Sequence, residues 1–441
     1  DGKLFADLSV GANVARTVTL EANSTLSNRG MIPHGEGFLV SEAQAASLDQ
    51  GALLRPYRNG RDITSRPRGV LVIDTFGLTE DQLWDRYPQT WQWLRGRVKP
   101  ERDQNPRKST REKWWLFGEQ RKVLRAAHSG ISRFIVTVQT AKHRLFTFLP
   151  ENILPDDKLI AIALDDASFL GVLSSRVHTL WALVTGGAMG VGNDPVYNKG
   201  KCFDAYPFPV LTGAQAEEIR GLAERLDAHR KRQQAEHPDL TLTGMYNVLE
   251  KLRAEEPLTA KDRTIHEHGL VSFLRELHDD LDRAVFDAYG WSDLAGVLVG
   301  RPGATTPLPD KPADQAEAEE ELLCRLVTLN AERAAEEAQG HIRWLRSDYQ
   351  APEATQATAT LKAKPENATE ATAEPAKKPT WPKSMPEQVE SVRRLLAIGP
   401  QTPDALASHF KRKPTKSITQ VLAALEVLGQ AHEDGNQWRL A

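Results

Sequence analysis

Apolar residues that recur every three or four positions predict most of the helices of this chain. The clearest such segments are residues 81–97, 166–183, several pieces of 214–346, and three short stretches at 386–398, 402–410 and 415–428. This spacing puts the apolar side chains on one face of a helix, where they can be buried. Thr212 stands just before the long segment that starts near residue 214, and we expect it to cap that helix.

Short apolar runs bounded by turn-forming residues predict strands. The runs are residues 70–73, 134–138, 145–149 and 159–164. They are rich in Val, Ile, Leu and Phe and too short for independent helices. Residues 1–50 are typical of short strands and turns, and the pair Asn59–Gly60 is a tight-turn signal.

Composition divides the chain into four regions. Residues 1–210 hold the strand-like runs, and residues 211–350 are mostly helical. Residues 351–383 are an Ala/Thr/Glu/Pro/Lys tract that cannot bury much apolar surface, so we expect a flexible linker. Residues 384–441 regain periodic apolar positions. The predicted class is α+β, with a mixed β-rich domain, a helical spacer domain, a disordered linker and a small C-terminal domain.

The C-terminal region has the pattern of a winged helix. Three short helical segments are followed by a hairpin signal at Asp434–Gly435–Asn436. In a winged helix the third helix enters a DNA groove, which makes Lys413, Lys416 and Gln420 candidate DNA contacts. Winged helices also bind proteins, so both kinds of partner stay open for this region.

Length, apolar runs and cysteine count exclude several classes of protein. The 441 residues are enough for two to four domains. The sequence has no run of about 18 apolar residues, so we expect no membrane span, and it does not start with a signal peptide. Cys202 and Cys324 are the two cysteines, which argues against a disulfide framework and favours the cytoplasm. Because the chain enters strand-like sequence directly at Asp1, we expect natural sequence to precede it.

The charge of the chain is segregated. Residues 55–144 hold 20 Lys and Arg against nine Asp and Glu, a net charge of +11, whereas the whole chain has −3 and the remainder therefore −14. Half of the ten Trp residues lie in the same stretch, and Arg outnumbers Lys there. Such a basic segment is typical of a site for a polyanion, and Arg suits phosphates and guanine edges. The alternative is a solvated face that pairs with the acidic helices downstream.

Two segments resemble nucleotide-binding or methyl-transfer motifs and fail on context. Residues 186–192 are rich in glycine, but a predicted helix precedes them and no helix opens after them. Residues 193–197, Asn-Asp-Pro-Val-Tyr, have a residue inserted relative to an Asn-Pro-Pro-Tyr motif and lack its first proline. That motif grips one amine with the Asn side chain and the adjoining carbonyl, so we expect no catalysis here.

Serine and histidine clusters give no better candidate. Ser174 and His178 share a predicted helix face with Ser175, but no acid is placed to orient the histidine, so we expect packing and phosphate contact instead. His266, His268 and His278 lack the spacing of metal ligands on a helix. We therefore expect no catalytic residue and no metal in this chain.

An ordered series of motifs resembles a known family. The members are Arg55–Asp62 (RPYRNGRD), Ile73–Asp74, Trp114–Gly118 (WWLFG), Lys142–Arg144 (KHR), Leu170–Trp181, Tyr197, Cys202–Pro209 (CFDAYPFP) and Leu281–Trp291. Together they resemble the C-terminal part of large class I adenine-specific (N6) DNA methyltransferases, the type IIG-like restriction–modification and phage-defence enzymes. The resemblance covers roughly residues 1–350. The proline-rich segment 203–209 and the helix after it also resemble the exit from a target-recognition domain in type I specificity subunits.

The resemblance implies DNA recognition without the chemistry. In that family the N-terminal half binds S-adenosylmethionine through a glycine-rich loop, and an Asn/Asp-Pro-Pro-Tyr motif acts on a flipped adenine. This chain has neither motif in usable form. It corresponds to the target-recognition domain, expected at residues 1–210, and to the helical spacer. We therefore expect no cofactor in this chain, with S-adenosylmethionine implied for the missing catalytic half.

The expected partners are double-stranded DNA, a methyltransferase catalytic domain that is fused or supplied in trans, and other defence-system subunits. The residues expected to contact DNA are Arg58, Asn59, Arg61, Arg66, Arg111, Trp114, Arg121, Lys142, His143, Arg144, Ser174 and Arg176. Two alternatives remain: a complete enzyme whose active site is not recognisable, and a non-catalytic winged-helix regulator or adaptor that docks a partner protein.

Overall fold

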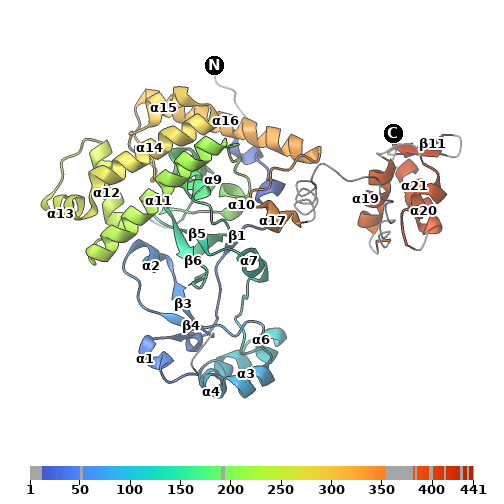
Figure 1. Ribbon diagram of the computed structural model, residues 1–441, viewed down its shortest axis with the longest axis horizontal. Helices are drawn as coiled ribbons and strands as arrows, with labels where there is room; N and C mark the ends of the chain where they lie inside the picture. Colours follow the sequence, from blue (N-terminus) through green and yellow to red (C-terminus); the bar gives the residue numbers. More distant parts are fainter. Residues whose placement is uncertain are drawn as a thin grey trace, which may run out of the picture. The chain divides into compact units, whose positions relative to one another are not determined.

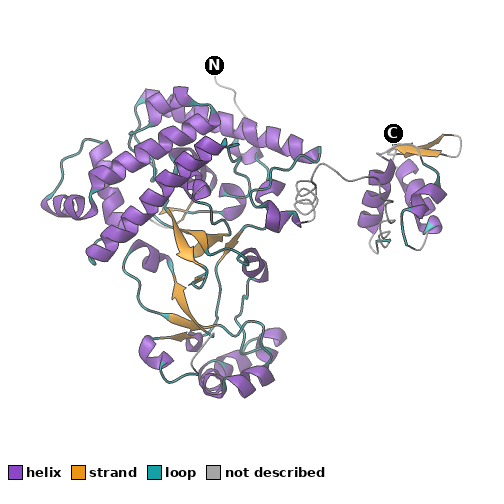
Figure 2. Ribbon diagram, in the orientation of Figure 1, coloured by secondary structure: helices purple, strands orange, loops and turns teal. Residues whose placement is uncertain are grey.

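The computed structural model describes residues 12–49, 53–189, 194–352, 381–382, 385–396, 401–411, 414–427, 431–434 and 437–440. The chain forms two compact units, Asp1–Leu361 and Lys362–Ala441. The described residues mix long helices with small sheets (Figure 2), so the predicted α+β class is confirmed. Most of the expected linker, residues 353–380, lies outside the described residues.

A four-stranded antiparallel sheet lies at the centre of the first unit. Its strands are β1 (Ser27–Arg29), β8 (Leu159–Ile162), β5 (Arg133–Val138) and β6 (Phe146–Pro150), in that order across the sheet. Ile135 of β5 lies opposite Phe148 of β6 on one side and opposite Ile162 of β8 on the other. The strands predicted at 134–138, 145–149 and 159–164 are confirmed.

This central sheet is buried on both faces. Ile135 and Ile162 pack into a helical core, while their neighbours Phe134 and Ala161 pack into a second core on the opposite face. Successive side chains of a strand point to opposite faces, so a strand of continuous apolar residues feeds both cores at once. The sheet is therefore the joint between the two parts of this unit.

Helices cover one face of the sheet (Figure 1). They are α8 (Ala167–Ser174), α9 (Arg176–Thr185), α10 (Lys199–Cys202), α11 (Gly213–Glu236), α12 (Leu242–Arg253), α13 (Ala260–Gly269), α14 (Val271–Tyr289), α15 (Ser292–Leu298), α16 (Ala313–Ala338) and α17 (Ser347–Gln350). Thr212 caps α11 as predicted: its side chain accepts from the Gln215 N–H, and the Gln215 side chain accepts from the Thr212 N–H. A short hairpin of β9 (Ala188–Met189) and β10 (Asp194–Pro195) follows α9.

The expected helix over residues 166–183 is two helices. Ser175 is extended and separates α8 from α9, which meet at an angle of 61°. No single helix among the described residues has the length and apolar character needed to cross a membrane, although this bent pair passes the same test when the two are taken together.

The other face of the sheet carries a smaller lobe. Its strands are β2 (Leu39–Val40), β4 (Leu71–Ile73), β3 (Leu54–Arg58) and β7 (Leu154–Pro155), in that order. Its helices are α1 (Glu42–Ala45), α2 (Gly60–Thr64), α3 (Glu80–Arg86), α4 (Pro88–Arg97), α5 (Lys99–Asp103), α6 (Lys108–Glu112) and α7 (Lys122–Ala127). The single helix predicted over 81–97 is broken at Tyr87, because Pro88 disfavours helical backbone in the residue before it and starts α4 instead.

The helical core does not stop at the expected boundary near residue 210. Leu26, α8, α9 and the segment around Phe203 and Tyr206 all pack into it together with α11 and α14. Tyr289 at the end of α14 donates its hydroxyl to the Tyr206 hydroxyl at 2.7 Å. Residues on both sides of position 210 thus share one core.

The second unit has its own core. Its helices are α19 (Met385–Leu396), α20 (Pro403–Ser408) and α21 (Thr415–Val427), and β11 (Ala431–Asp434) pairs with β12 (Gln437–Leu440) in an antiparallel hairpin. Val392, Leu406, Ile418 and Trp438 are buried together. This is the succession of three helices and a hairpin that the sequence predicts.

Candidate nucleic-acid interface

Helix α2 is packed tightly against the end of strand β5. A side chain at Gly60 would begin only 2.8 Å from Cγ1 of Val138, so glycine is needed for the two elements to touch. Asn59 caps α2 by accepting hydrogen bonds from the N–H groups of Arg61 and Asp62. The Asn59–Gly60 pair is thus a helix start and not the tight turn that the sequence predicts. The contact brings Arg58 and Arg61 to the end of the central sheet.

The backbone extends this contact to neighbouring strands. The Gln139 N–H donates to the Lys158 carbonyl at 2.8 Å, and the Asp156 N–H donates to the Arg58 carbonyl at 2.8 Å. Strand β3, the end of β5 and the start of β8 are therefore held side by side. Arg58, Gln139 and Lys158 lie on adjacent segments as a result.

Lys142 joins this group from the loop between β5 and β6. It is exposed, and its Nζ donates to Oδ1 of Asn247 on α12 at 2.6 Å. We call Arg58, Arg61, Lys142 and Lys158 the cationic rim. Arg61, Lys142 and Lys158 are exposed, Arg58 is half-buried, and among the described residues none of the four has a carboxylate within 4 Å. Four positive charges thus lie near the end of β5 and the start of β8 with no ion pair among the described residues.

Carboxylates near the rim are occupied by other groups. Asp157 pairs with Arg29 and with Arg121, and Asp156 accepts the Tyr57 hydroxyl at 2.8 Å. Asp62 is bound by both guanidinium arms of Arg68 at 2.8 and 2.9 Å. Burial would raise the pKa of Asp62, but the hydrogen bonds from Arg68 and from the Asn59 backbone lower its pKa overall. Arginines outside the rim thus neutralise Asp157 and Asp62, whereas Asp156 keeps its charge and accepts the backbone N–H of Lys158 at 2.8 Å.

Arg66 lies near the other end of α2. It lines a cleft of about 570 Å³ between this segment and α11, with Phe148 and Leu149 of β6 and with Lys231 of α11. Arg66 is exposed and, among the described residues, makes no ion pair. It is thus accessible, but on a different element from most of the rim.

Arg144 does not present its charge from the loop as expected. Its Nη1 donates to Oγ1 of Thr137 at 3.0 Å and to the Val138 carbonyl, and its Nη2 donates to the Pro195 carbonyl at 3.0 Å. Only 2 % of the residue is exposed, and burial lowers the pKa of Arg144 to about 10. The side chain is used to hold β5 and the β9–β10 hairpin together, which corrects its assignment as a DNA contact.

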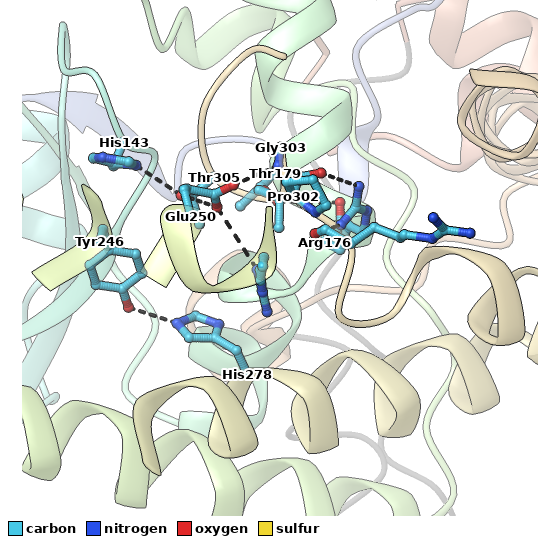
Figure 3. A network of polar contacts seen from close by, with 12 residues as sticks. His143, Arg176, Thr179, Tyr246, Glu250, His278, Pro302, Gly303 and Thr305 are labelled. Carbon is cyan, nitrogen blue, oxygen red and sulfur yellow. Dashed lines mark hydrogen bonds and ion pairs between the residues drawn. The ribbon is translucent and has the colours of Figure 1, made fainter. Parts of the chain in front are cut away.

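His143 is also buried and serves as a tie between elements (Figure 3). Its Nδ1 lies 3.0 Å from Oγ1 of Thr305, and its Nε2 lies 3.0 Å from Oδ1 of Asn247. Glu250 of α12 continues the network by accepting the Gly303 N–H at 2.6 Å. The loop between α15 and α16 is thereby bound to the β5–β6 loop, and His143 has no free ring nitrogen for DNA.

Three further expected contacts are buried as well. Arg176 donates to the carbonyls of Arg301 and Pro302 and to Glu319 at 2.9 Å. Ser174 is buried at the break between α8 and α9. Trp114 is 2 % exposed, lies in the core of the smaller lobe and donates its indole N–H to Glu80. Trp114 is therefore a core residue in this conformation and does not offer a face to stack on bases.

The remaining expected contacts are held by the protein itself. Arg111 donates to the carbonyls of Asn105 and Pro106 at 2.6 and 3.0 Å. Arg121 donates to the Gly30 carbonyl and to Asp157. Across residues 55–144, seven of the 20 cations form ion pairs among the described residues, namely Arg55, Arg68, Lys99, Lys108, Arg121, Arg125 and Arg133. The positive charge is therefore only partly neutralised locally.

The serine and histidine side chains do not assemble a site. Ser175 donates its hydroxyl to the Val172 carbonyl, whereas His178 bonds Tyr197. His266 bonds Ser272 and His278 bonds Tyr246. Among the described residues, no group of three or more His, Cys, Asp or Glu side chains is placed to hold a metal ion.

In the second unit, Lys416 and Gln420 are exposed on α21. Lys413 lies outside the described residues. Of the expected set, Arg61, Arg66, Lys142, Lys416 and Gln420 are exposed, Arg58, Arg111 and Arg121 are half-buried, and Asn59 is engaged as a helix cap.

Sequence reasoning missed Lys158 and Gln139. Lys158 lies outside the basic stretch, next to Asp156 and Asp157, so local charge gives no signal for it. Only the pairing of β5 with β8 brings both residues to the rim. The signal was therefore long-range strand register, which a single sequence does not fix.

Solved structures are similar in fold, and one of them is the type IIL restriction–modification enzyme MmeI, determined in complex with DNA, with a TM-score of 0.52 and 14 % sequence identity. The match covers 74 % of this chain and 38 % of that enzyme, so the chain spans well under half of its length. The chain thus shares the fold of part of a restriction–modification enzyme. It matches no protein-family model and no curated protein sequence.

The buried histidines predict that acid destabilises the fold. Burial lowers the pKa of five of them: His128 to about 3, His143 to about 4, His178 to about 3, and also His229 and His278. Because the unfolded chain binds protons near pH 6.5 and the folded chain does not, the free energy of unfolding falls as the pH falls from 7 to 5. Each strongly shifted histidine contributes at most about 2 kcal/mol at pH 5.

Asp282 acts in the opposite direction, because burial raises its pKa to about 6 and protonation then favours the folded chain. Urea unfolding at pH 7, 6 and 5 measures the free energy of unfolding, which contains the contributions of the histidines and of Asp282 together. His143→Gln should flatten the pH dependence, because it removes one histidine whose pKa burial lowers. An unfolding free energy that stays constant from pH 7 to 5 would contradict the assignment.

Proposed function

We propose that the first unit is the DNA-recognition portion of a site-specific adenine DNA methyltransferase. It would bind duplex DNA along the cationic rim, and the S-adenosylmethionine site and the methyl-transfer residues would belong to a catalytic part outside this chain, fused or in trans. The observation that carries the proposal is the rim itself: Arg58, Arg61, Lys142 and Lys158 lie at one end of the central sheet, and none of them forms an ion pair within the described part of the chain. The fold shared with part of MmeI supports it.

The rim suits a phosphate backbone. Lys and Arg side chains that lack carboxylate partners can neutralise phosphates and release condensed counter-ions. The elements that carry them are fixed by strand pairing and by the close packing of Gly60 on Val138, so their spacing is set before DNA arrives. Phosphate contacts of this kind position a protein on DNA, while base contacts supply the sequence preference.

The described part of the glycine-rich stretch does not have the form of an S-adenosylmethionine loop. The glycine-rich stretch that starts at Gly186 follows helix α9 and leads into the β9–β10 hairpin, so it lacks the strand before and the helix after that a cofactor loop requires. A side chain at Gly186 would begin 2.0 Å from the Val196 carbonyl, so this glycine serves packing. Tyr197 is fully buried, and Asn193 lies outside the described residues. We derive no methyl-transfer step from this chain.

A second candidate function concerns the C-terminal unit. Its three helices and hairpin support a winged helix, and Lys416 and Gln420 are exposed on the helix that would enter a groove. Because this unit has its own core, it can act separately as a DNA-binding regulator or as an adaptor for a partner protein.

Removing rim charges should weaken DNA binding and its dependence on salt. Arg61→Ala, Lys142→Ala and Lys158→Ala should each lower the affinity of the full chain for duplex DNA and reduce the slope of log affinity against log salt by about 0.9 per lost phosphate contact. Fluorescence anisotropy at several salt concentrations measures both. The matched control is Lys108→Ala, because Lys108 lies on α6 and is paired with Glu112. Unchanged slopes in all three rim variants, or the same loss in the control, would refute the proposal.

Truncation after residue 352 separates the two candidate functions. The two units have separate cores, so the first should stay folded without the second. If the rim is the principal DNA site, the truncated chain keeps the DNA affinity and the salt slope of the full chain. If the chain is an adaptor that binds DNA through its C-terminal unit, the truncated chain loses both. Circular dichroism of the truncated chain checks its folding.

The full chain alone should not methylate DNA. Incubation with labelled S-adenosylmethionine and mixed-sequence duplex DNA should give no incorporation, since the described part of the glycine-rich stretch follows a helix and leads into a hairpin instead of joining a strand to a helix. An active adenine methyltransferase in the same buffer is the positive control. Incorporation by this chain would mean that it is a complete enzyme with an active site of another kind.

A further inference from the structure

We propose that Gln139 reads an adenine in the major groove of the DNA that lies along the cationic rim. The inference rests on the proposed function and adds to it the residue that selects a base. Gln139 directly follows strand β5 and lies beside Lys158 at the start of β8. Its position is therefore between the charges that would hold the phosphates.

The backbone of Gln139 is fixed from both sides. Its N–H donates to the Lys158 carbonyl at 2.8 Å, and its carbonyl accepts the Tyr197 N–H at 2.7 Å. Tyr197 is itself fully buried in the helical core. A residue held in this way cannot shift without disturbing β8 and the segment after β10. Its side chain thus starts from a rigid platform, as a base-reading residue requires.

The side-chain amide of Gln139 has no structural task. It makes no hydrogen bond among the described residues, and neither of its polar atoms is closed off from solvent. The side-chain oxygens of three other amides are engaged: Asn59 caps α2, Asn198 caps α10, and Oδ1 of Asn247 accepts from Lys142. Gln139 differs from them because its acceptor is free as well as its donor.

An amide of this kind matches adenine. Its N–H can donate to N7 and its oxygen can accept from the N6 amino group, which is a bidentate pair that only adenine completes in the major groove. Arg58, Arg61 and Lys158 would supply the sequence-independent phosphate contacts around it. The rim would thus supply affinity for any DNA sequence, and the Gln139 amide would supply the preference for adenine.

Selection of duplexes from a random-sequence pool by the full chain tests the inference. The wild-type chain should enrich a motif that contains an adenine position. Gln139→Ala should lower the preference for that adenine by roughly 5- to 150-fold, the range for one bidentate side chain–base pair, and leave the salt slope unchanged. Gln139→Arg should move the preference at the same position to guanine, because arginine pairs with O6 and N7 of guanine.

The matched control is Gln92→Ala, the same change at an exposed glutamine on α4 that likewise makes no hydrogen bond among the described residues. It should keep the wild-type motif. Since the Gln139 amide supports no fold contact, urea unfolding of both alanine variants should match the wild type.

The outcomes separate the two proposals. If the wild-type chain enriches a motif and both Gln139 variants enrich the same one, Gln139 does not read a base, while the proposed function stands. If the wild-type chain enriches no motif, the proposed DNA recognition fails, and the role of Gln139 fails with it. A motif that changes at a single position in both variants supports the inference.

Discussion

The double burial of the central sheet is the constraint on which the first unit depends. Strands β5 and β8 supply side chains alternately to the helical core and to the core of the smaller lobe. A slip of one residue in their pairing would exchange the two sets, so the register is fixed from both sides. One outer strand of the sheet is covered as well. The outer strands are β1 and β6, and the carbonyls of β6 at Phe146 and Phe148 accept from Arg230 and Lys231 of α11. A helix thus occupies the edge that another strand would otherwise pair with.

This rigidity explains how scattered residues become one surface. The rim comes from β3, α2, the β5–β6 loop and the start of β8, which are far apart in sequence and meet only through the sheet. Arg144 holds the β5–β6 loop in place, since its guanidinium donates to groups of β5 and of the β9–β10 hairpin. Burying this cation without a carboxylate partner costs desolvation free energy. The carbonyl and hydroxyl acceptors around the guanidinium offset part of this cost. The loop that carries Lys142 therefore has little freedom to move away from the sheet edge.

The local elements of this fold could be predicted from the sequence, whereas long-range pairing could not. Apolar runs predicted β5, β6 and β8, and a helical stripe with Thr212 as its cap predicted α11. Two pairs of helices, α8 with α9 and α3 with α4, were each predicted as a single helix. The apolar periodicity continues through Ser175 and Tyr87 even though the backbone turns there. Of the candidate site, Arg58, Arg61 and Lys142 were predicted and reach the surface together. Lys158 and Gln139 were missed, because only the pairing of β5 with β8 brings them to the same edge.

The basic stretch also shows why charge density alone is a poor guide to a binding surface. Its cations have at least three uses, and each follows from the surroundings. Arg144 is buried and solvated by carbonyls and a hydroxyl, Arg125 is bound bidentately to Asp74, and Arg61 faces solvent and forms no ion pair among the residues that the structure describes. A guanidinium that already has its donors satisfied gains little from a phosphate, because the new contact replaces an existing one. The cations that remain available to a partner are therefore those that the fold leaves unpaired, and strand register decides which these are more than the number of arginines in the sequence does.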